Sequence, residues 1–277
     1  MGCPEPAWDP AISSAAHSQL TGTLASLVFG AIVFILSKDV TARRTHGQAV
    51  ALLVAGFFTF ALDSFIFGVT SGERVCGRAW TETMVAAGLM GIGALGLFTG
   101  LAWLLRIHDA DNRAAFRATT LAAYLVAIAV GFQLQETAHD YLHDTGAALP
   151  SWLQNSVSDY VLAIVIISAA HFGFKRILRR LAPKVVSTTA YITIAYAFVT
   201  LWLFSWASGL DPKEWQIGHQ NHIAYIAVSL ALGLPALTLV LQLVALPGPD
   251  ESAVPAQPAR PDAGPVDDEE ATAVLRR

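Results

Sequence analysis

The chain has 277 residues, of which 54% are hydrophobic and 14% are charged, and its net charge at pH 7 is −4. Soluble domains carry about 25% charged residues. Because so few charges cannot cover a water-facing surface, this composition excludes an ordinary soluble globular domain.

Seven stretches of the chain are long and apolar enough to cross a bilayer, which requires about 20 such residues. In lipid, every backbone N–H and C=O must be paired within the structure, so these stretches are predicted to be helices. The fold class is therefore all-α, a polytopic membrane bundle with seven transmembrane helices. The predicted spans are 19–37, 48–70, 80–105, 116–136, 152–174, 185–208 and 222–246.

The orientation follows from the Lys and Arg residues, most of which follow the first, third and fifth spans. Such loops face the cytoplasm, which places the N-terminus outside and the C-terminus inside the cell membrane, the inner or plasma membrane. The basic run at 175–180 is interpreted as an anchor at anionic lipid, and no nucleic-acid partner is expected.

Two terminal segments flank the predicted bundle of 19–246. Residues 1–18 contain no Lys or Arg, so a cleavable signal peptide is not expected and the segment is predicted to be extracytoplasmic. Residues 247–277 are rich in Pro and hold seven acids against three arginines. Such a composition predicts a disordered cytoplasmic tail, which is either only solvated or binds a protein partner.

The third span carries a row of glycines, including the G-x-x-x-G pair Gly96 and Gly100. Glycines let a neighbouring helix approach closely. The pattern therefore predicts tight packing within the chain, with a homo-oligomer contact as the alternative. The two cysteines, Cys3 and Cys76, are both expected outside the membrane, where they could form a disulfide.

Ionisable residues inside the spans are the most informative feature of the sequence, because each costs at least about 2.5 kcal/mol at the bilayer centre. They are Asp63, Glu82, Glu136 and Asp159. All four are expected in the outer half of the membrane, opposite the basic loops. The alternative is that Glu82 and Glu136 reach headgroup water, and that Asp63 and Asp159 only make interhelical hydrogen bonds.

Polar neighbours of these acids extend the pattern. Gln133 shares a helical face with Glu136, and Asn155 shares one with Asp159, whereas Tyr196 and Tyr225 lie in the last two spans. We interpret the set as an outward-facing acidic cavity that binds a proton, a cation or a small cationic solute. Asp63 and Asp159 would hold the positive charge, and Glu82 and Glu136 would attract it.

The segment QETAHDYLHD at 135–144 places His139 and His143 beside acids, and His219 and His222 follow before the last span. Imidazole and carboxylate suit Zn²⁺ or Cu²⁺. A metal site is therefore one interpretation of this segment. A pH-sensing site and a solvated helix end are the others.

These features favour a transporter or channel in the lipid bilayer over the other functional classes. A seven-helix receptor or sensor is the alternative, followed by a membrane-embedded enzyme or a metal-binding protein. An enzyme is the less favoured of these, because no nucleotide-binding or hydrolase motif is present. A retinal protein needs a Schiff-base lysine in the seventh helix, and the lysines here lie in loops, which excludes retinal.

Overall fold

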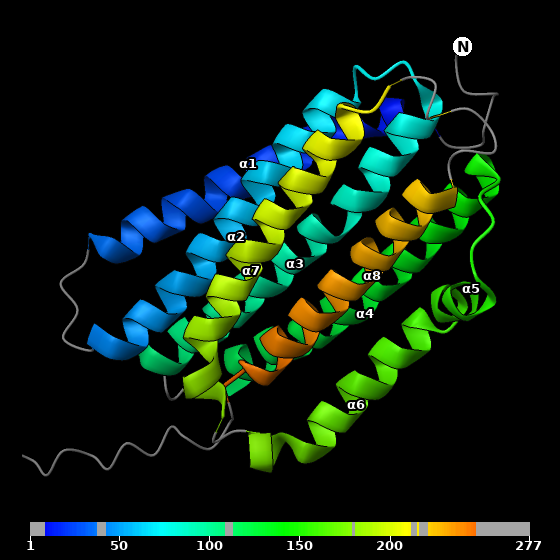
Figure 1. Ribbon diagram of the computed structural model, residues 1–277. Helices are drawn as coiled ribbons and strands as arrows, with labels where there is room; N and C mark the ends of the chain where they lie inside the picture. Colours follow the sequence, from blue (N-terminus) through cyan, green and yellow to red (C-terminus); the bar gives the residue numbers. More distant parts are fainter. Residues whose placement is uncertain are drawn as a thin grey trace, which may run out of the picture.

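The computed structural model describes residues 9–37, 43–108, 113–178, 181–211, 215 and 221–247. Within these ranges the chain forms a bundle of α-helices and contains no strand (Figure 1). The helices are α1 (Pro10–Leu36), α2 (Arg43–Thr70), α3 (Cys76–His108), α4 (Arg113–Thr145), α5 (Ser151–Ser158), α6 (Tyr160–Leu178), α7 (Ala182–Ser208) and α8 (Asn221–Val244).

The helices confirm the predicted fold class. Six helices in the described part of the chain are long and apolar enough to cross a membrane, and α5 with α6 adds a seventh span if this bent pair counts as one. The fifth span was predicted as a continuous helix, but the structure breaks it at residue 159, with a bend of 56°. The orientation of the termini stays a prediction.

Two helices extend further than the apolar runs that predicted them. The α1 helix begins at Pro10 instead of residue 19, because the carboxylate of Asp9 caps it by accepting from the backbone N–H of Ala11 at 2.8 Å. Proline at the first helical position also favours this start. The α4 helix runs to Thr145 instead of residue 136, so the whole segment 135–144 is helical.

Helix α3 is the centre of the bundle. Its most apolar window is 72% buried, the largest share among the candidate spans in the described chain. It contacts α2, α4, α7 and α8, whereas α1 packs mainly on α2 and α6 mainly on α4 and α8. As a result α1 and α6 lie at opposite edges of the bundle (Figure 1).

The glycines of α3 allow this central packing. A side chain at Gly93 would lie 2.6 Å from the Thr59 hydroxyl oxygen, and one at Gly88 would collide with Tyr196 and Pro235. A side chain at Gly100 would lie 3.1 Å from Leu53 of α2, whereas one at Gly96 would make ordinary contacts with Gln242 of α8 and Leu52 of α2. The predicted glycine face therefore packs within the chain, where missing side chains let helices approach closely.

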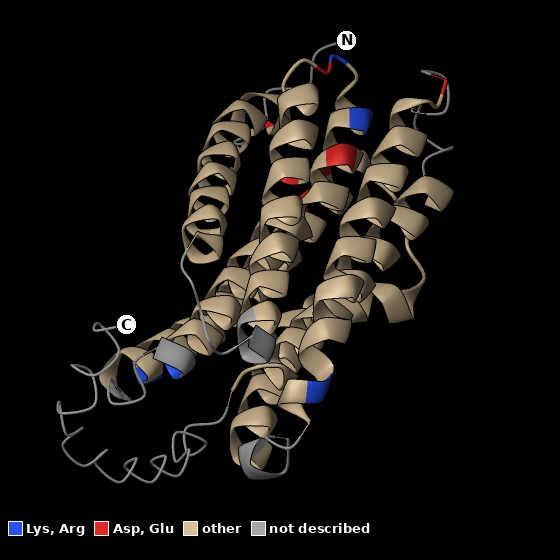
Figure 2. Ribbon diagram, turned by 90° about the vertical axis from the view of Figure 1, so that its left-hand side faces the viewer, with Lys and Arg blue, Asp and Glu red and all other residues tan. Residues whose placement is uncertain are grey.

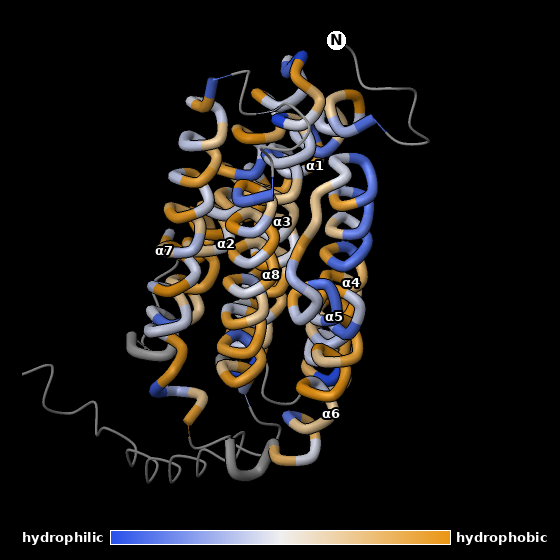
Figure 3. Tube along the Cα trace, turned by 45° about the vertical axis from the view of Figure 1, so that its right-hand side comes forward, coloured by the Kyte–Doolittle hydropathy of each residue, from blue (hydrophilic) through white to orange (hydrophobic). Residues whose placement is uncertain are grey.

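The outer surface of the bundle is apolar. Large side chains such as Phe29, Phe172, Tyr191 and Trp202 are all more than half exposed. Hydrophobic residues run along the helices on the outside, and hydrophilic ones gather toward the ends and along the upper part of α4 (Figure 3). An apolar surface of this extent indicates contact with lipid instead of water.

Candidate functional site

Two carboxyl groups lie inside the bundle, one on α2 and one on α3. The side chains of Asp63 and Glu82 are 0% and 1% exposed. Acidic residues of the described chain gather in the half of the bundle that carries the α2–α3 loop, residues 71–75, whereas basic residues lie at the two ends (Figure 2). We call this end the α2–α3 loop end. Although both acids are buried, their hydrogen bonding differs.

Glu82 is fully hydrogen-bonded. The hydroxyl of Ser208 on α7 donates to its Oε1 at 2.7 Å, and the hydroxyl of Thr70 on α2 lies 3.0 Å from its Oε2. One carboxyl group therefore joins three helices. This arrangement could hold the bundle together and could also hold an exchangeable proton.

Asp63 has no such partners. Neither of its carboxylate oxygens forms a hydrogen bond, although both are buried. The hydroxyl of Thr21 on α1 lies beside the carboxyl group, but it donates its single hydrogen to the backbone carbonyl of His17 at 2.8 Å. A buried polar group without a partner costs about 1–3 kcal/mol, so Asp63 opposes folding instead of supporting it.

Tyr196 of α7 is the second unpartnered polar group of this region. Its hydroxyl is buried and lies beside the Thr200 hydroxyl of the same helix without a close hydrogen bond, and it interacts electrostatically with Asp63 and with Tyr160 of α6. The ring is 4% exposed and reaches Gly88 of α3, where no side chain blocks it. The absence of a side chain at Gly88 therefore admits the Tyr196 hydroxyl into the interior near Asp63.

We call Asp63, Tyr196, Thr21 and Tyr160 the Asp63 cluster. Its members come from α2, α7, α1 and α6. Asp63 forms no ion pair with the described residues, and the nearest arginine along α3, Arg78, is bonded to Glu73 at 3.2 Å and to the carbonyl of Leu210 at 3.1 Å. The cluster therefore presents an acid without a positive partner from the described chain.

The structure does not bring all predicted site residues into this cluster. Asp63 and Tyr196 lie together, and Glu82 lies nearer the α2–α3 loop end. The predicted residues outside the interior are Glu136, Asn155, Asp159 and Tyr225, which are exposed, and Gln133, which is half-buried. The structure therefore corrects the expectation of a single cavity: Asp63 and Glu82 are buried, whereas Glu136 and Asp159 are exposed.

Asp159 lies at the break between α5 and α6. It ends α5, and its own carbonyl oxygen accepts from the N–H of Ala163 in α6 at 2.9 Å. The side-chain oxygen of Gln135 on α4 accepts from the N–H of Val161 at 3.1 Å. This bond pairs one of the backbone donors that the start of a helix leaves open, and it fixes α6 to α4.

Tyr160, the next residue, connects this break to α8. Its hydroxyl donates to the backbone carbonyl of Leu232 at 3.0 Å. Leu232 lies in the turn before Pro235, which has no N–H to donate and disturbs the helical ladder of that turn. Neighbouring side chains commonly pair the carbonyls that a proline leaves open in membrane helices. Tyr160 bonds the carbonyl of Leu232, the residue after Ala231, whose carbonyl Pro235 leaves without its helical donor.

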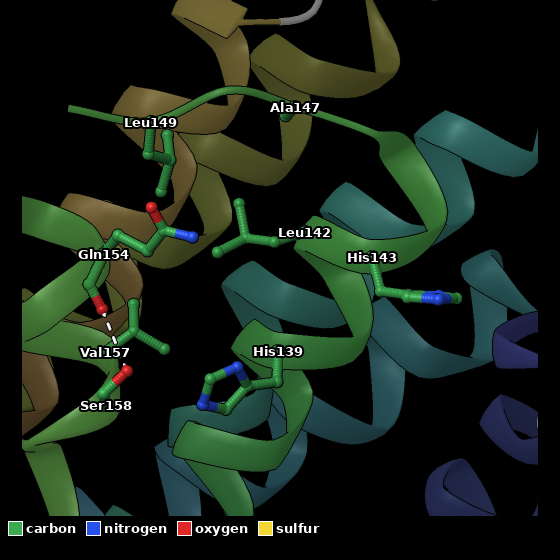
Figure 4. A pocket seen from close by; sticks show the side chains of 8 residues that line it. All are labelled: His139, Leu142, His143, Ala147, Leu149, Gln154, Val157 and Ser158. Carbon is green, nitrogen blue, oxygen red and sulfur yellow. Dashed lines mark hydrogen bonds between the residues drawn. The ribbon is translucent and has the colours of Figure 1, made fainter. Parts of the chain in front are cut away.

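The histidines at the end of α4 border a cavity of about 290 Å³ between α4 and α5. The ring of His139 points into this cavity, whereas that of His143 points away (Figure 4) and bonds Asp144 at 2.9 Å. His222 does not line the cavity, and His219 lies outside the described residues. Within those residues no group of three or more His, Cys, Asp or Glu could hold a metal.

Cys76, the first residue of α3, is not a free thiol. Its predicted partner Cys3 lies outside the described residues, so the pairing stays a prediction. Sequence reasoning did not single out Thr70, Ser208, Gln135 and Tyr160. Each contacts a residue on another helix, and sequence spacing gives no signal for such a contact.

The comparisons with known proteins identify no relative. No family model, no curated protein and no solved structure matches this chain. The fold and the site together define a multi-pass helical membrane bundle in which the carboxyl group of Asp63 is buried without a hydrogen bond. Its function is therefore argued from this geometry.

Proposed function

We propose that this protein transports a proton or a small cation across a membrane, and that Asp63 binds the transported charge. One observation carries the proposal: both carboxylate oxygens of Asp63 are buried without a hydrogen-bond partner. An ionised carboxylate in such a place requires a positive charge or a proton.

A purely structural role for Asp63 is less favourable on energetic grounds. Interhelical hydrogen bonds are the usual structural reason for a polar residue in a membrane helix, and Glu82 has two of them. Asp63 has none, so its carboxyl group lowers the stability of the bundle without linking any helices. Costs of this kind are typical of functional sites.

The proposed direction of access is from the α2–α3 loop end. Glu82 lies six residues after the start of α3 and Asp63 seven residues before the end of α2, and the Arg-rich segments at the other end suit the cytoplasm by the positive-inside rule. The proposed orientation therefore has the carboxyl groups toward the extracytoplasmic side of a cell membrane, with the N-terminus outside and the C-terminal segment inside.

The test is an ion-flux measurement on purified protein in liposomes, with Asp63→Asn as the variant. We expect the variant to lose flux, because an amide cannot exchange charge. The matched control is Asp159→Asn, the same substitution at an exposed aspartate outside the Asp63 cluster, which should retain flux. Equal flux in the wild type and in Asp63→Asn would contradict the proposal.

A sensor is the second candidate, and the cavity between α4 and α5 favours it. The cavity is bordered by Val157 and Ser158, just before the break, and Tyr160 just after the break bonds α8. A ligand bound there could therefore shift α8. Deleting residues 248–277 separates the two functions, because a transporter should keep its flux whereas a tail-coupled sensor should lose its output.

A further inference from the structure

The surroundings of Asp63 contain few groups that could coordinate a metal ion. A calcium ion takes six to eight oxygen ligands and magnesium takes six. Besides its own two oxygens, the hydroxyls of Thr21 and Tyr196 interact with the carboxyl group of Asp63. These four side-chain oxygens are fewer than calcium or magnesium takes, and the described residues hold no group of three or more His, Cys, Asp or Glu that could bind a metal.

Backbone carbonyl groups do not complete the set. Transporters that bind sodium commonly use unwound helix segments, whose carbonyls are free to coordinate the ion. Here Asp63, Thr21 and Tyr196 all lie within continuous helices, α2, α1 and α7.

A proton needs fewer ligand atoms than a metal ion. It binds one carboxylate oxygen covalently, removes the buried negative charge and turns the group into a hydrogen-bond donor. The hydroxyl of Tyr196 interacts electrostatically with Asp63 but forms no hydrogen bond to it. One proton thus compensates the buried negative charge without any further ligand.

Glu82 offers a second proton-binding group between Asp63 and the α2–α3 loop end. Thr70, which bonds Glu82, lies two helical turns after Asp63 on α2, a rise on the order of 10 Å. A proton that leaves Asp63 as hydronium could reach Glu82 through rotating hydroxyl groups and mobile water. The charge stays balanced, because each carboxylate becomes neutral as the other becomes negative.

Other titratable groups on the packed elements do not compete for this role. On α1, the His17 ring stacks on Phe67 at 5.2 Å and its Nδ1 lies 2.9 Å from the carbonyl of Ser13. On α7 and α6 the titratable groups that interact with the site are Tyr196 and Tyr160. On α3 it is Glu82.

We propose that the charge bound at Asp63 is a proton, exchanged with the α2–α3 loop end through Glu82, and that a metal cation is not accepted. This inference rests on the proposed transport function and narrows its substrate class. The small set of oxygen ligands carries it, together with the burial of both Asp63 oxygens without a hydrogen bond.

The experiment uses the full chain in liposomes that contain a pH-sensitive dye, with a potassium diffusion potential as the driving force. We expect proton uptake in the wild type with either sodium or choline outside. Asp63→Asn should reduce the rate of proton uptake by about 100-fold or more, which is the usual contribution of a positioned proton-transfer group to a rate. Glu82→Gln should slow proton uptake, and Asp63→Glu should retain part of the uptake that Asp63→Asn loses. The control Asp159→Asn should match the wild type.

An infrared spectrum of the resting protein gives a readout that does not depend on flux. The carbonyl stretch of a protonated carboxyl group should be present in the wild type and reduced in Asp63→Asn. Sodium flux that depends on Asp63, without proton uptake, would overturn the proton assignment and leave the proposed cation transport standing. If neither ion moves in an Asp63-dependent way and the band is unchanged, both proposals fail.

Discussion

The substitution Asp63→Leu should raise the stability of the protein while it removes function. Leu branches at Cγ as Asp does, so it can occupy a similar space without polar atoms. Both carboxylate oxygens of Asp63 are buried and unpartnered, and each such group costs about 1–3 kcal/mol. Allowing for packing strain from the larger methyl groups, we expect a net gain of about 2 kcal/mol.

Thermal unfolding in detergent measures this gain. One kcal/mol shifts the melting temperature of a domain of roughly 150–250 residues by about 2–4 °C. Asp63→Leu should therefore melt about 4–8 °C above the wild type. The comparison variant is Glu82→Leu, which loses the bonds from Ser208 and Thr70 and should melt lower by a similar amount.

The opposite signs of the two variants are the decisive result. Both replace a buried acid by the same residue, so they differ mainly in hydrogen bonding. If Asp63→Leu melted as far below the wild type as Glu82→Leu, the carboxyl group of Asp63 would be a structural contact. The energetic argument for a functional role would then be refuted.

Three further predictions concern the packing around the site. Tyr160→Phe removes the bond to Leu232 and should cost about 1 kcal/mol in thermal unfolding, whereas Tyr191→Phe, 73% exposed, should cost nothing measurable. Gly93→Ala adds a methyl group 2.6 Å from the Thr59 hydroxyl oxygen and should cost about 1–3 kcal/mol. Gly30→Ala, with no atom within 4 Å, is the neutral control. Equal melting temperatures of these two variants would contradict the packing argument. If Cys3 and Cys76 are bonded, a thiol-alkylating reagent should label neither cysteine before reduction and both cysteines after it, as measured by mass spectrometry. Labelling of either cysteine without reductant would exclude the disulfide.

Part of the candidate site could be predicted from the sequence because burial in a membrane follows from local composition. Asp63 and Glu82 stand within long apolar runs, and a helix in such a run has few ways to expose them to water. The structure buries both. The same reasoning failed for Asp159 and Glu136, because apolar neighbours along the chain do not determine which side of a helix faces the bundle.

The break at Asp159 also lay beyond sequence reasoning. The stretch 152–174 has no proline or other clear helix-breaking signal at the break, so it predicted one helix. The bend depends on contacts with other helices: Gln135 of α4 pairs the open backbone donor of Val161, and Tyr160 bonds α8. Such partners lie far away along the chain and become neighbours only in the folded bundle.

The sequence by itself determined that this chain is a bundle of long apolar helices able to span a membrane, because the bilayer requires such helices with internally paired backbones. It also determined which residues would be costly inside such a bundle. Only the tertiary structure decided which of them are enclosed and which have partners. Asp63 and Glu82 have the same chemistry, and they differ because the Ser208 hydroxyl donates to Glu82 and the Thr70 hydroxyl lies 3.0 Å from it, whereas neither oxygen of Asp63 has a hydrogen bond.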